Sequence, residues 1–207
     1  MKYSIIIPAH NSAAFIRKCL ESVRMQSYTD YELIVICDRC SDNTQEVVTP
    51  YADIVIVTDY GNDGPPRQDG IEASHGERIL FLDDDDYWMH EYVLEMIDQA
   101  FDDSTDILCF GFIFAGIGYA RPVRTLEDGS ILFWPSVWSK CYKREFIKDI
   151  PLRYVEVKGT QAPDIDWTER LLAMLPTYSI LDQPLYYYNF NRKGSQTNTK
   201  VYGNAGS

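Results

Sequence analysis

The chain has 207 residues, of which 45% are hydrophobic and 14% aromatic, so it can bury a substantial core and is not intrinsically disordered. Its formal net charge of −12 at pH 7 argues against nucleic acid as a partner, because phosphate backbones are bound by basic surfaces. No apolar stretch approaches the roughly 20 residues that span a bilayer, and the N-terminus lacks the pattern of a signal peptide. We therefore expect a cytoplasmic protein with one large domain, or one domain with an appended subdomain.

Short β-like runs alternate with helical patterns over the first hundred residues. Strands are expected at residues 3–7, 32–36, 53–58 and 78–82, and helices at 13–26, 41–48, 67–74 and 90–101. In the first of these helices Ile16, Leu20 and Val23 share one face with the 3.6-residue period of an amphipathic helix, and Ser41 is a plausible N-cap of the second. Such alternation indicates an α/β fold with a parallel sheet and right-handed crossovers.

The pattern changes after about residue 104. A long β-like run is expected at 106–114, a polar loop at 121–130, helices at 136–150 and 164–175, and late strands at 178–181 and 185–190. The sequence shows no linker between the two parts. We therefore divide one domain into a first half at 1–104 and a second half at 105–196, followed by a small, polar tail at 197–207 that is expected to be flexible.

Two of the five cysteines form a C-x-x-C sequence, Cys37 to Cys40, after the second predicted strand. An odd number of cysteines is typical of reduced thiols in the cytosol. The sequence could be a thioredoxin-like redox pair or half of a zinc site. The aromatic and proline neighbours of a redox loop are missing, and no second Cys/His pair stands at zinc spacing. We therefore favour a different use for this loop, in ligand binding.

Four consecutive aspartates at 83–86 follow the apolar run 79–82 and precede two aromatic residues. Two like charges about 4 Å apart repel by roughly 1–4 kcal/mol, so the run needs a counter-charge. In an extended backbone alternate side chains share a face, which would place Asp83 with Asp85. Their oxygens suit Mg²⁺ or Mn²⁺, which also bind substrate phosphates. A solvated acidic turn is the alternative, but a buried strand ends here and ligands bind beyond such ends, so we favour a metal site.

Polar loops follow three of the predicted strands, at 8–11, 37–42 and 83–86, and all three should lie at the same edge of a parallel sheet. The dinucleotide fingerprint G-x-G-x-x-G and the P-loop G-x-x-x-x-G-K-[ST] are both absent. A loop aspartate could accept a hydrogen bond from a base N–H, and the aspartate run could hold a cation on a diphosphate. The pattern indicates a nucleotide-diphosphate site without a glycine cradle.

An ordered set of segments resembles the family 2 glycosyltransferases, which have the GT-A fold and transfer a sugar from a nucleotide donor. The segments are SIIIPAHN at 4–11, YELIVICDRCSDNT at 31–44, GPPRQDG at 64–70, GERILFLDDDDYW at 76–88, WSKCYKREF at 138–146, IDW at 165–167 and RKGS at 192–195. The resemblance covers nearly the whole chain. It implies a Rossmann-like, mostly parallel sheet flanked by helices, in which residues 1–104 bind the nucleotide sugar and residues 105–196 supply the acceptor side and the catalytic base.

The resemblance also implies individual roles. The residues expected to bind the nucleotide sugar are Pro8, Ala9, His10, Asn11, Asp38, Arg67, Asp83, Asp84, Arg192 and Ser195. Among these, Asp38 would accept from the base edge, Asp84 would lie near the ribose, and Arg192 with Ser195 would close over the diphosphate. Asp83 and Asp85 would form the D-x-D metal pair, in which Asp85 is favoured as the direct ligand.

Asp166 falls at the position of the family's general base, with Asp164 as the alternative. The chain departs from the family pattern at two places. Cys37 replaces the first of two adjacent aspartates in the nucleotide loop, and Ile165 replaces the acidic residue usually found beside the base. The choice between Asp164 and Asp166 therefore stays open at this point.

The activity expected from the resemblance is an inverting single displacement, with Mn²⁺ or Mg²⁺ as cofactor, in polysaccharide or surface-glycan synthesis. The donor would be a nucleotide sugar, with a UDP-sugar favoured, and the acceptor a glycan or a lipid-linked sugar. The enzyme could work at the inner membrane face and could form a homodimer. Two alternatives stay open: a catalytically weak nucleotide- or sugar-binding module, and a sugar nucleotidyltransferase. The latter would need a glycine-rich, basic loop after the first strand, which residues 8–12 do not provide.

Overall fold

The computed structural model describes residues 1–61, 64–128, 131–152, 156–157, 160–161 and 163–189. Its main sheet contains, in the described part of the chain, the strands β1 (Tyr3–Ala9), β2 (Tyr31–Asp38), β3 (Ile54–Thr58), β4 (Arg78–Phe81), β5 (Tyr87–Trp88), β6 (Ile107–Phe114), β7 (Gly118–Ala120), β10 (Lys140–Lys143) and β13 (Tyr178–Tyr188). Their spatial order is β3-β2-β1-β4-β10-β6-β13-β5, with β7 beside β6. The sheet is mixed, because β10 lies antiparallel between β4 and β6, whereas β1, β2, β3 and β4 are parallel.

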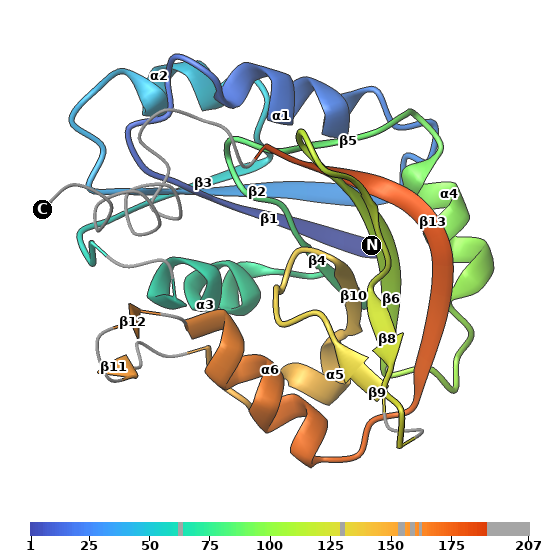
Figure 1. Cartoon of the computed structure of the whole chain (residues 1–207). Coiled ribbons are helices and arrows are strands. Elements are labelled where there is room, and N and C mark those ends of the chain that lie inside the picture. Colours follow the sequence, from blue (N-terminus) through green and yellow to red (C-terminus); the bar gives the residue numbers. More distant parts are fainter. Residues whose placement is uncertain (62–63, 129–130, 153–155, 158–159, 162, 190–207) are drawn as a thin grey trace, which may run out of the picture.

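Helices cover both faces of this sheet (Figure 1). They are α1 (Ile16–Arg24), α2 (Thr44–Val48), α3 (Gly64–Ala73), α4 (Val93–Ala100), α5 (Arg144–Ile147) and α6 (Pro163–Ala173). Along β1, Ile5 and Ile7 pack with α1, α2 and α4 on one face, whereas Ile6 packs with α3, α5 and α6 on the other. Uninterrupted apolar runs in the central strands therefore produce a sheet that is buried on both sides, as expected of parallel strands.

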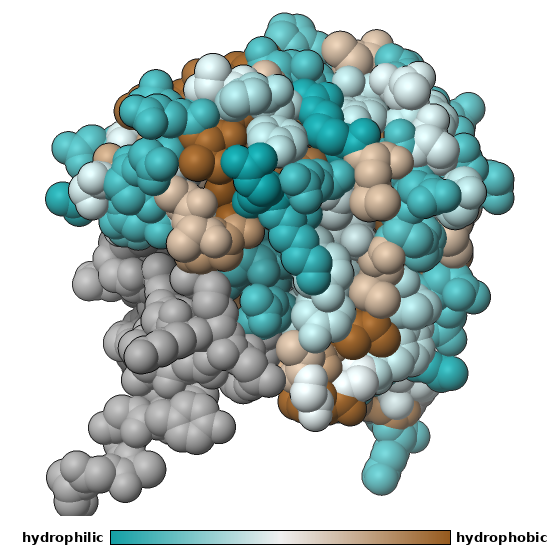
Figure 2. Space-filling view, turned by 90° about the horizontal axis from the view of Figure 1, so that it is seen from above, coloured by the Kyte–Doolittle hydropathy of each residue, from teal (hydrophilic) through white to brown (hydrophobic). Residues whose placement is uncertain are grey.

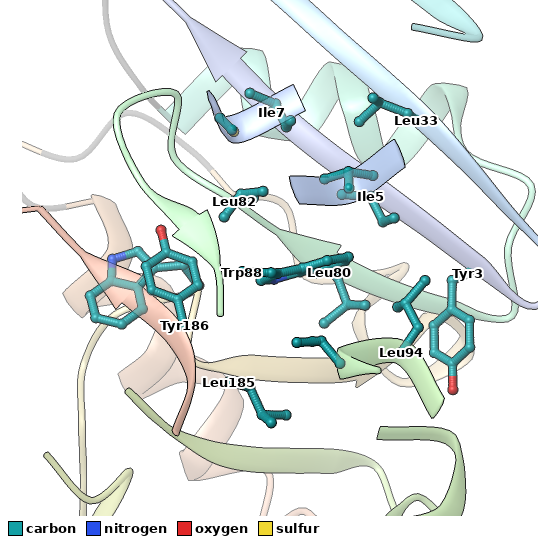
Figure 3. Packing of buried hydrophobic residues seen from close by; sticks show 14 of the residues in the cluster. Tyr3, Ile5, Ile7, Leu33, Leu80, Leu82, Trp88, Leu94, Leu185 and Tyr186 are labelled. Atoms are coloured by element: carbon teal, nitrogen blue, oxygen red, sulfur yellow. The ribbon is translucent and has the colours of Figure 1, made fainter. Parts of the chain in front are cut away.

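The core on the α1 side extends from β1 across the sheet to β13. Figure 3 shows Ile5, Ile7 and Leu80 on one side of Trp88 and the residues Leu185 and Tyr186 of β13 on the other. This contact joins the first and second halves of the sequence in one core. Figure 2 shows the molecule from above, on the side of α1 and α2, where hydrophilic residues surround small, separate hydrophobic spots.

Two short antiparallel hairpins lie outside the main sheet. β8 (Val123–Thr125) pairs with β9 (Ile131–Phe133), and β11 (Glu156–Val157) pairs with β12 (Thr160–Gln161). No helix within the described residues is long and apolar enough to cross a membrane.

The expected helix at 136–150 is wrong. Its central residues form β10, and only Arg144–Ile147 is helical. Cys141 packs on the α1 face of the sheet and Tyr142 on the α3 face, which is the two-residue alternation of a strand. The segment fills the space between β4 and β6, so tertiary pairing determines its conformation.

Three smaller expectations also differ. The polar segment expected as a loop at 121–130 contains the strand β8, and the two late strands are one strand, β13, with register shifts around Pro184. α2 begins at Thr44 rather than after Ser41, and the carboxylate of Asp42 accepts the Thr44 N–H at 3.0 Å. α3 begins at Gly64, three residues before its expected start. The tail at 197–207 lies outside the described residues.

Candidate functional site

The loops after β1, β2 and β4 meet at one edge of the sheet. Ala9 pairs in register with Cys37, which brings the ends of β1 and β2 together. His10 lies between the other two loops: its Nδ1 is 2.7 Å from the carbonyl oxygen of Asp38, and its backbone N–H donates to Oδ2 of Asp84 at 3.2 Å. The arrangement that the strand pattern predicted is therefore present in the structure.

Asn11 connects the loop after β1 to the loop after β2 through hydrogen bonds. Its side-chain oxygen accepts the backbone N–H of Ser41 at 2.7 Å and of Asp42 at 3.3 Å. Asn11 has φ of +48°, a left-handed conformation that asparagine tolerates better than most residues. Its amide oxygen therefore has a structural use, beyond the ligand contact expected from the sequence.

The carboxylate of Asp38 is almost completely buried and binds the segment that follows β3. One oxygen accepts the Thr58 hydroxyl at 2.9 Å and the Tyr60 N–H at 2.7 Å, and the other accepts the Gly61 N–H at 2.7 Å. Asp38 thus holds a fourth loop against the edge of the sheet. Any contact with a base would come in addition to these hydrogen bonds.

Arg67 joins two carboxylates from different elements. Its guanidinium, only 5% exposed, lies 2.6 Å from Oδ1 of Asp83 and 3.7 Å from Oδ1 of Asp164. Asp83 follows β4, Arg67 belongs to α3, and Asp164 stands in the first turn of α6. The charged hydrogen bond to Asp83 fixes orientation as well as distance, whereas Asp164 forms an ion pair with Arg67 without a hydrogen bond. The cluster therefore couples the aspartate run to the helix that carries the candidate base.

The carboxylates of this cluster repel one another despite the arginine. Burial raises the pKa of Asp83 to about 6. The negative charges of Asp164 and Asp85 add to this rise, and the positive charge of Arg67 acts against it. Burial, and then the neighbouring Asp85, raises the pKa of Asp84 to about 7, while the hydrogen bond from His10 N–H acts in the opposite direction. A cation at this point would favour the charged form of each carboxylate and so lower both pKa values.

The expected alternation of the four aspartates is wrong, because the run is not extended. The N–H of Asp86 donates to the carbonyl oxygen of Asp83 at 3.1 Å, which closes a turn. Asp86 points into the protein and is 1% exposed. It accepts the Tyr186 hydroxyl at 2.5 Å and the Asn189 N–H at 2.7 Å. Asp86 is therefore a structural residue.

The oxygen donors at the site fit a hard divalent cation in type. Asp83 and Asp85 offer carboxylate oxygens, the ligands that Mg²⁺ and Mn²⁺ prefer, and such ions usually take further oxygens from water and phosphate. Oδ1 of Asp164 is buried without a hydrogen-bond partner among the described residues. Within the same residues, no three His, Cys, Asp or Glu side chains gather as a metal-binding group. A diphosphate would have to complete the coordination.

The two candidate bases face different neighbours. The buried Trp167, whose ring lies 5.9 Å from Phe81 and whose Nε1–H donates to the Ile150 carbonyl at 2.7 Å, fixes the rotation of α6. Asp164 then points to Arg67, whereas Asp166 accepts from Nε of Arg170 at 2.8 Å. Asp166 is 27% exposed. Both carboxylates thus belong to the first turn of α6, but only Asp164 contacts Arg67.

The contribution of Tyr186 to the site was not predicted from the sequence. Its hydroxyl donates to Asp86 and accepts the backbone N–H of Asp83 at 3.2 Å, so it supports the turn that presents the aspartates. It lies 103 residues after Asp83 in a run of three tyrosines, which carried no signal beyond sheet packing. The expected ligands Arg192 and Ser195 lie outside the described residues.

A family model described as glycosyl transferase family 2 matches residues 4–156 of the chain. The chain belongs to glycosyltransferase family 2. The resemblance inferred from the sequence motifs is thereby confirmed, together with the GT-A architecture.

Curated relatives include two bacterial proteins. The poly(ribitol-phosphate) β-N-acetylglucosaminyltransferase TarS of Staphylococcus aureus (strain Mu50) is 28% identical over 210 residues, which cover 94% of this chain and 36% of TarS. The putative glycosyltransferase EpsH of Bacillus subtilis (strain 168) is 26% identical, with 91% of this chain and 60% of EpsH covered. The chain thus spans between about a third and three fifths of the length of these relatives.

Solved structures show the same fold. The crystal structure of S. aureus TarS 1–349 in complex with UDP-GlcNAc is 26% identical, with a TM-score of 0.78 over 96% of this chain and 61% of that chain. The mannosyltransferase PcManGT from Pyrobaculum calidifontis, in complex with GDP-Man and Mn²⁺, is 14% identical with a TM-score of 0.68 over 93% of this chain and 58% of that chain, and shows a shared fold only.

Proposed function

We propose that the chain is a nucleotide-sugar glycosyltransferase that transfers a sugar from a UDP-sugar to an acceptor hydroxyl by inverting single displacement, in the synthesis of a polysaccharide or surface glycan. The observation that carries this proposal is the junction made by Arg67, Asp83 and Asp164 beside His10 and Asp38. It brings the nucleotide loops, the aspartate run and the base-bearing helix to one place. Membership of family 2 and the UDP-GlcNAc bound by TarS support the donor class.

Asp83 and Asp85 are proposed to hold Mn²⁺ or Mg²⁺. The charge that accumulates on the departing diphosphate would be stabilised by the bound cation. The residues present suit this role because burial and mutual repulsion already raise the pKa of Asp83. Arg67 keeps Asp83 oriented through its 2.6 Å contact.

We assign the general base to Asp166 and a positioning role to Asp164. A base must be reached by the acceptor hydroxyl, and the side chains of Asp164 and Asp166 are similarly exposed, at 24% and 27%. They differ in that Oδ1 of Asp164 is buried near Arg67, whereas Oδ2 of Asp166 is held by Arg170 of the same helix. Asp164 directs a buried oxygen at Arg67 and so helps to hold the arginine. Asp166 would take the proton from the acceptor oxygen as that oxygen attacks the anomeric carbon, while the nucleoside diphosphate leaves from the opposite face.

A direct test compares transfer and binding in two matched variants. General-base assistance is worth roughly 10²–10⁴-fold in rate, so Asp166→Asn should lose that much turnover and keep its affinity for UDP. Asp164→Asn should lose less turnover and should weaken UDP binding, because Arg67 loses one partner. If Asp164→Asn instead abolishes turnover at unchanged affinity, the two roles are reversed.

The donor is identified by a thermal-shift panel of nucleotide sugars with and without Mn²⁺. A ligand present at a hundred times its dissociation constant adds roughly 2.7 kcal/mol to the free energy of unfolding. We expect UDP-sugars to give the largest shifts, and only with metal. Slow donor hydrolysis in Mn²⁺ would separate an enzyme from a pure binding module. The cytoplasmic location, the inner membrane face, a glycan or lipid-linked acceptor and a homodimer belong to the same proposal.

A further inference from the structure

The turn between Cys37 and Cys40 brings two thiols together at the candidate nucleotide site. Arg39, between them, has φ of +50°, a conformation that few non-glycine residues adopt, and its backbone N–H donates to the Thr58 carbonyl at 3.0 Å. This left-handed residue reverses the chain directly after β2. The fourth residue of the turn therefore lies back against the strand.

The hydrogen bonds of Cys40 place its sulfur beside Cys37. Its Sγ–H lies 3.4 Å from the carbonyl oxygen of Ala9 and 3.8 Å from that of Asp38. Ala9 is the register partner of Cys37 on the neighbouring strand, and adjacent strands are about 4.8 Å apart. Cys40 is also close enough to Cys37 to add to the rise in the pKa of the Cys37 thiol. Two cysteines three residues apart across a chain reversal can be joined by a disulfide once their sulfurs turn towards each other.

We propose that Cys37 and Cys40 form a reversible disulfide that weakens nucleotide binding at this edge of the sheet. This rests on the proposed function, in which the loops after β1 and β2 bind the nucleotide. Cys37 precedes Asp38 at the end of β2, and Cys40 hydrogen-bonds to the Ala9 carbonyl, so a change in either sulfur acts directly on two expected walls of the base pocket.

The two thiols differ in access, which sets the order of the reaction. Cys37 is fully buried, whereas Cys40 is partly exposed. Cys40 loses its proton and its thiolate attacks one sulfur of an oxidant disulfide such as oxidised glutathione, which releases one glutathione thiolate. Cys37 then attacks Sγ of Cys40, the second glutathione leaves, and the protons and two electrons of both thiols have passed to the oxidant.

The oxidised form should persist until a reductant is added. Burial raises the pKa of the Cys37 thiol to about 12, and the neighbouring Cys40 adds to the shift. A thiol of high pKa is a poor leaving group, so attack at Cys40 that would expel Cys37 is slow. The same high pKa keeps little of Cys37 as thiolate, so the closing attack of Cys37 on Cys40 is slow as well.

Oxidation removes the thiol hydrogen of Cys40. The carbonyl oxygens of Ala9 and Asp38 lose that donor, and Sγ must turn from Ala9 towards Cys37. The carboxylate of Asp38 is held by the N–H groups of Tyr60 and Gly61, so the backbone of the turn has to change its conformation while this carboxylate stays in place. His10, which contacts the Asp38 carbonyl, moves with it. Residues of both loops that are expected to line the base pocket therefore change position.

The experiment oxidises the full chain with oxidised glutathione and then measures UDP affinity by calorimetry with Mn²⁺. Peptide mapping should show a link between Cys37 and Cys40 with the loss of two hydrogens. The dissociation constant of UDP should rise about tenfold or more, a size typical of coupling between two events, and dithiothreitol should restore it. Because linkage is reciprocal, saturating UDP should oppose formation of the disulfide by the same factor.

Two variants provide the controls. Cys40→Ser keeps a hydrogen donor for Ala9 but cannot form the bond, so its UDP affinity should not respond to the oxidant. Cys109→Ala removes a buried cysteine of the core and should respond as the parent does. Absence of the Cys37–Cys40 link under excess oxidant, or a link that leaves UDP affinity unchanged, overturns the proposal. Failure of the reduced protein to bind UDP overturns the proposed function instead, and mapping still reports whether the bond forms.

Discussion

The two ends of the aspartate run lie in different surroundings. Asp83 is partly exposed, repelled by other carboxylates and held by Arg67. Asp86, three residues later, is buried and receives hydrogen bonds from the Tyr186 hydroxyl and the Asn189 N–H. Burial, Asp83 and Asp85 raise the pKa of Asp86, and the two neutral donors only act against this rise. At Asp83 the opposing group is the charged Arg67. The candidate function belongs to the end of the run that a ligand can reach and that carries a charged partner.

The same hydroxyl group connects the two ends. Tyr186 donates to Asp86 and accepts from the backbone N–H of Asp83, and its ring stacks on Trp138 at 4.4 Å between centroids. The position of the site carboxylates is therefore coupled to a strand from the second half of the chain. Changes at the buried end should alter stability first, and changes at the exposed end should alter binding first.

The largest expected effect is that of Asp86→Ala on stability. The substitution leaves the Tyr186 hydroxyl and the Asn189 N–H without their acceptor inside the protein. Each unsatisfied buried group costs roughly 1–3 kcal/mol, so the free energy of unfolding should fall by about 3 kcal/mol. Urea denaturation measures this change, and Asp86→Asn, which retains an acceptor oxygen, should recover part of it.

Asp85→Ala is the matched substitution at the exposed end. We expect the free energy of unfolding to change by less than about 1 kcal/mol, as for most partly exposed positions. Metal-dependent UDP binding should be lost, which calorimetry with and without Mn²⁺ would show. Unchanged UDP affinity in this variant would exclude Asp85 as a metal ligand.

The next effect is that of Tyr186→Phe, which removes the hydroxyl and keeps the stacked ring. Asp86 loses a donor and the Asp83 N–H loses an acceptor, so stability should fall by about 2 kcal/mol. The affinity for UDP should fall too, because the turn that presents Asp83 is no longer held. A variant as stable as the parent, by denaturation, would show that the hydroxyl does not couple the two ends.

The sequence was most informative where apolar runs end at polar loops. The runs at Ile5–Ile7 and Ile79–Leu82 predicted buried parallel strands, and His10, Asp38 and Asp84 do meet at their carboxyl ends. This succeeded because strand direction alone determines which edge of a parallel sheet a loop occupies.

The remaining features depend on contacts between distant segments. β10 was expected as a helix, because the two-residue alternation of its side chains becomes clear only from its place between β4 and β6. The aspartate run turns instead of extending, which a fixed two-residue alternation could not anticipate. The different orientations of Asp164 and Asp166 follow from the burial of Trp167. None of these is a local property of the residues concerned.

A smaller effect is expected from Arg67→Lys. A lysine presents one ammonium in place of a planar fork, so it can serve Asp83 or Asp164 but not both in the present geometry. Turnover should fall about tenfold, equivalent to roughly 1.4 kcal/mol in the barrier. Steady-state kinetics measures this, with Arg78→Lys as the control, because Arg78, at the start of β4, is also buried but pairs with Asp98. Equal effects of the two changes would contradict a special role for Arg67.

The smallest effect concerns Lys140, a buried residue of positive charge. It tests how uncharged partners affect a buried ionisable group whose charge is opposite to that of Asp86. Its ammonium donates to the carbonyl oxygens of Trp134 and Ser136 at 2.5 and 2.6 Å, and burial lowers its pKa to about 8. Between pH 8 and about 10.5 the folded chain releases this proton while the unfolded chain keeps it. Because the unfolded state then binds more protons, this group's contribution to stability rises with pH.

Lys140→Met serves as the reference that does not titrate. The difference in free energy of unfolding between the parent and Lys140→Met should shift in favour of the parent by about 1 kcal/mol from pH 8 to pH 9.5. Denaturation curves at several pH values measure it, and the other titrating groups cancel in the difference. A constant difference would mean that the two carbonyl oxygens keep Lys140 charged. Uncharged partners would then stabilise a buried cation, whereas the donors at Asp86 only partly oppose the rise in the pKa of that carboxyl group.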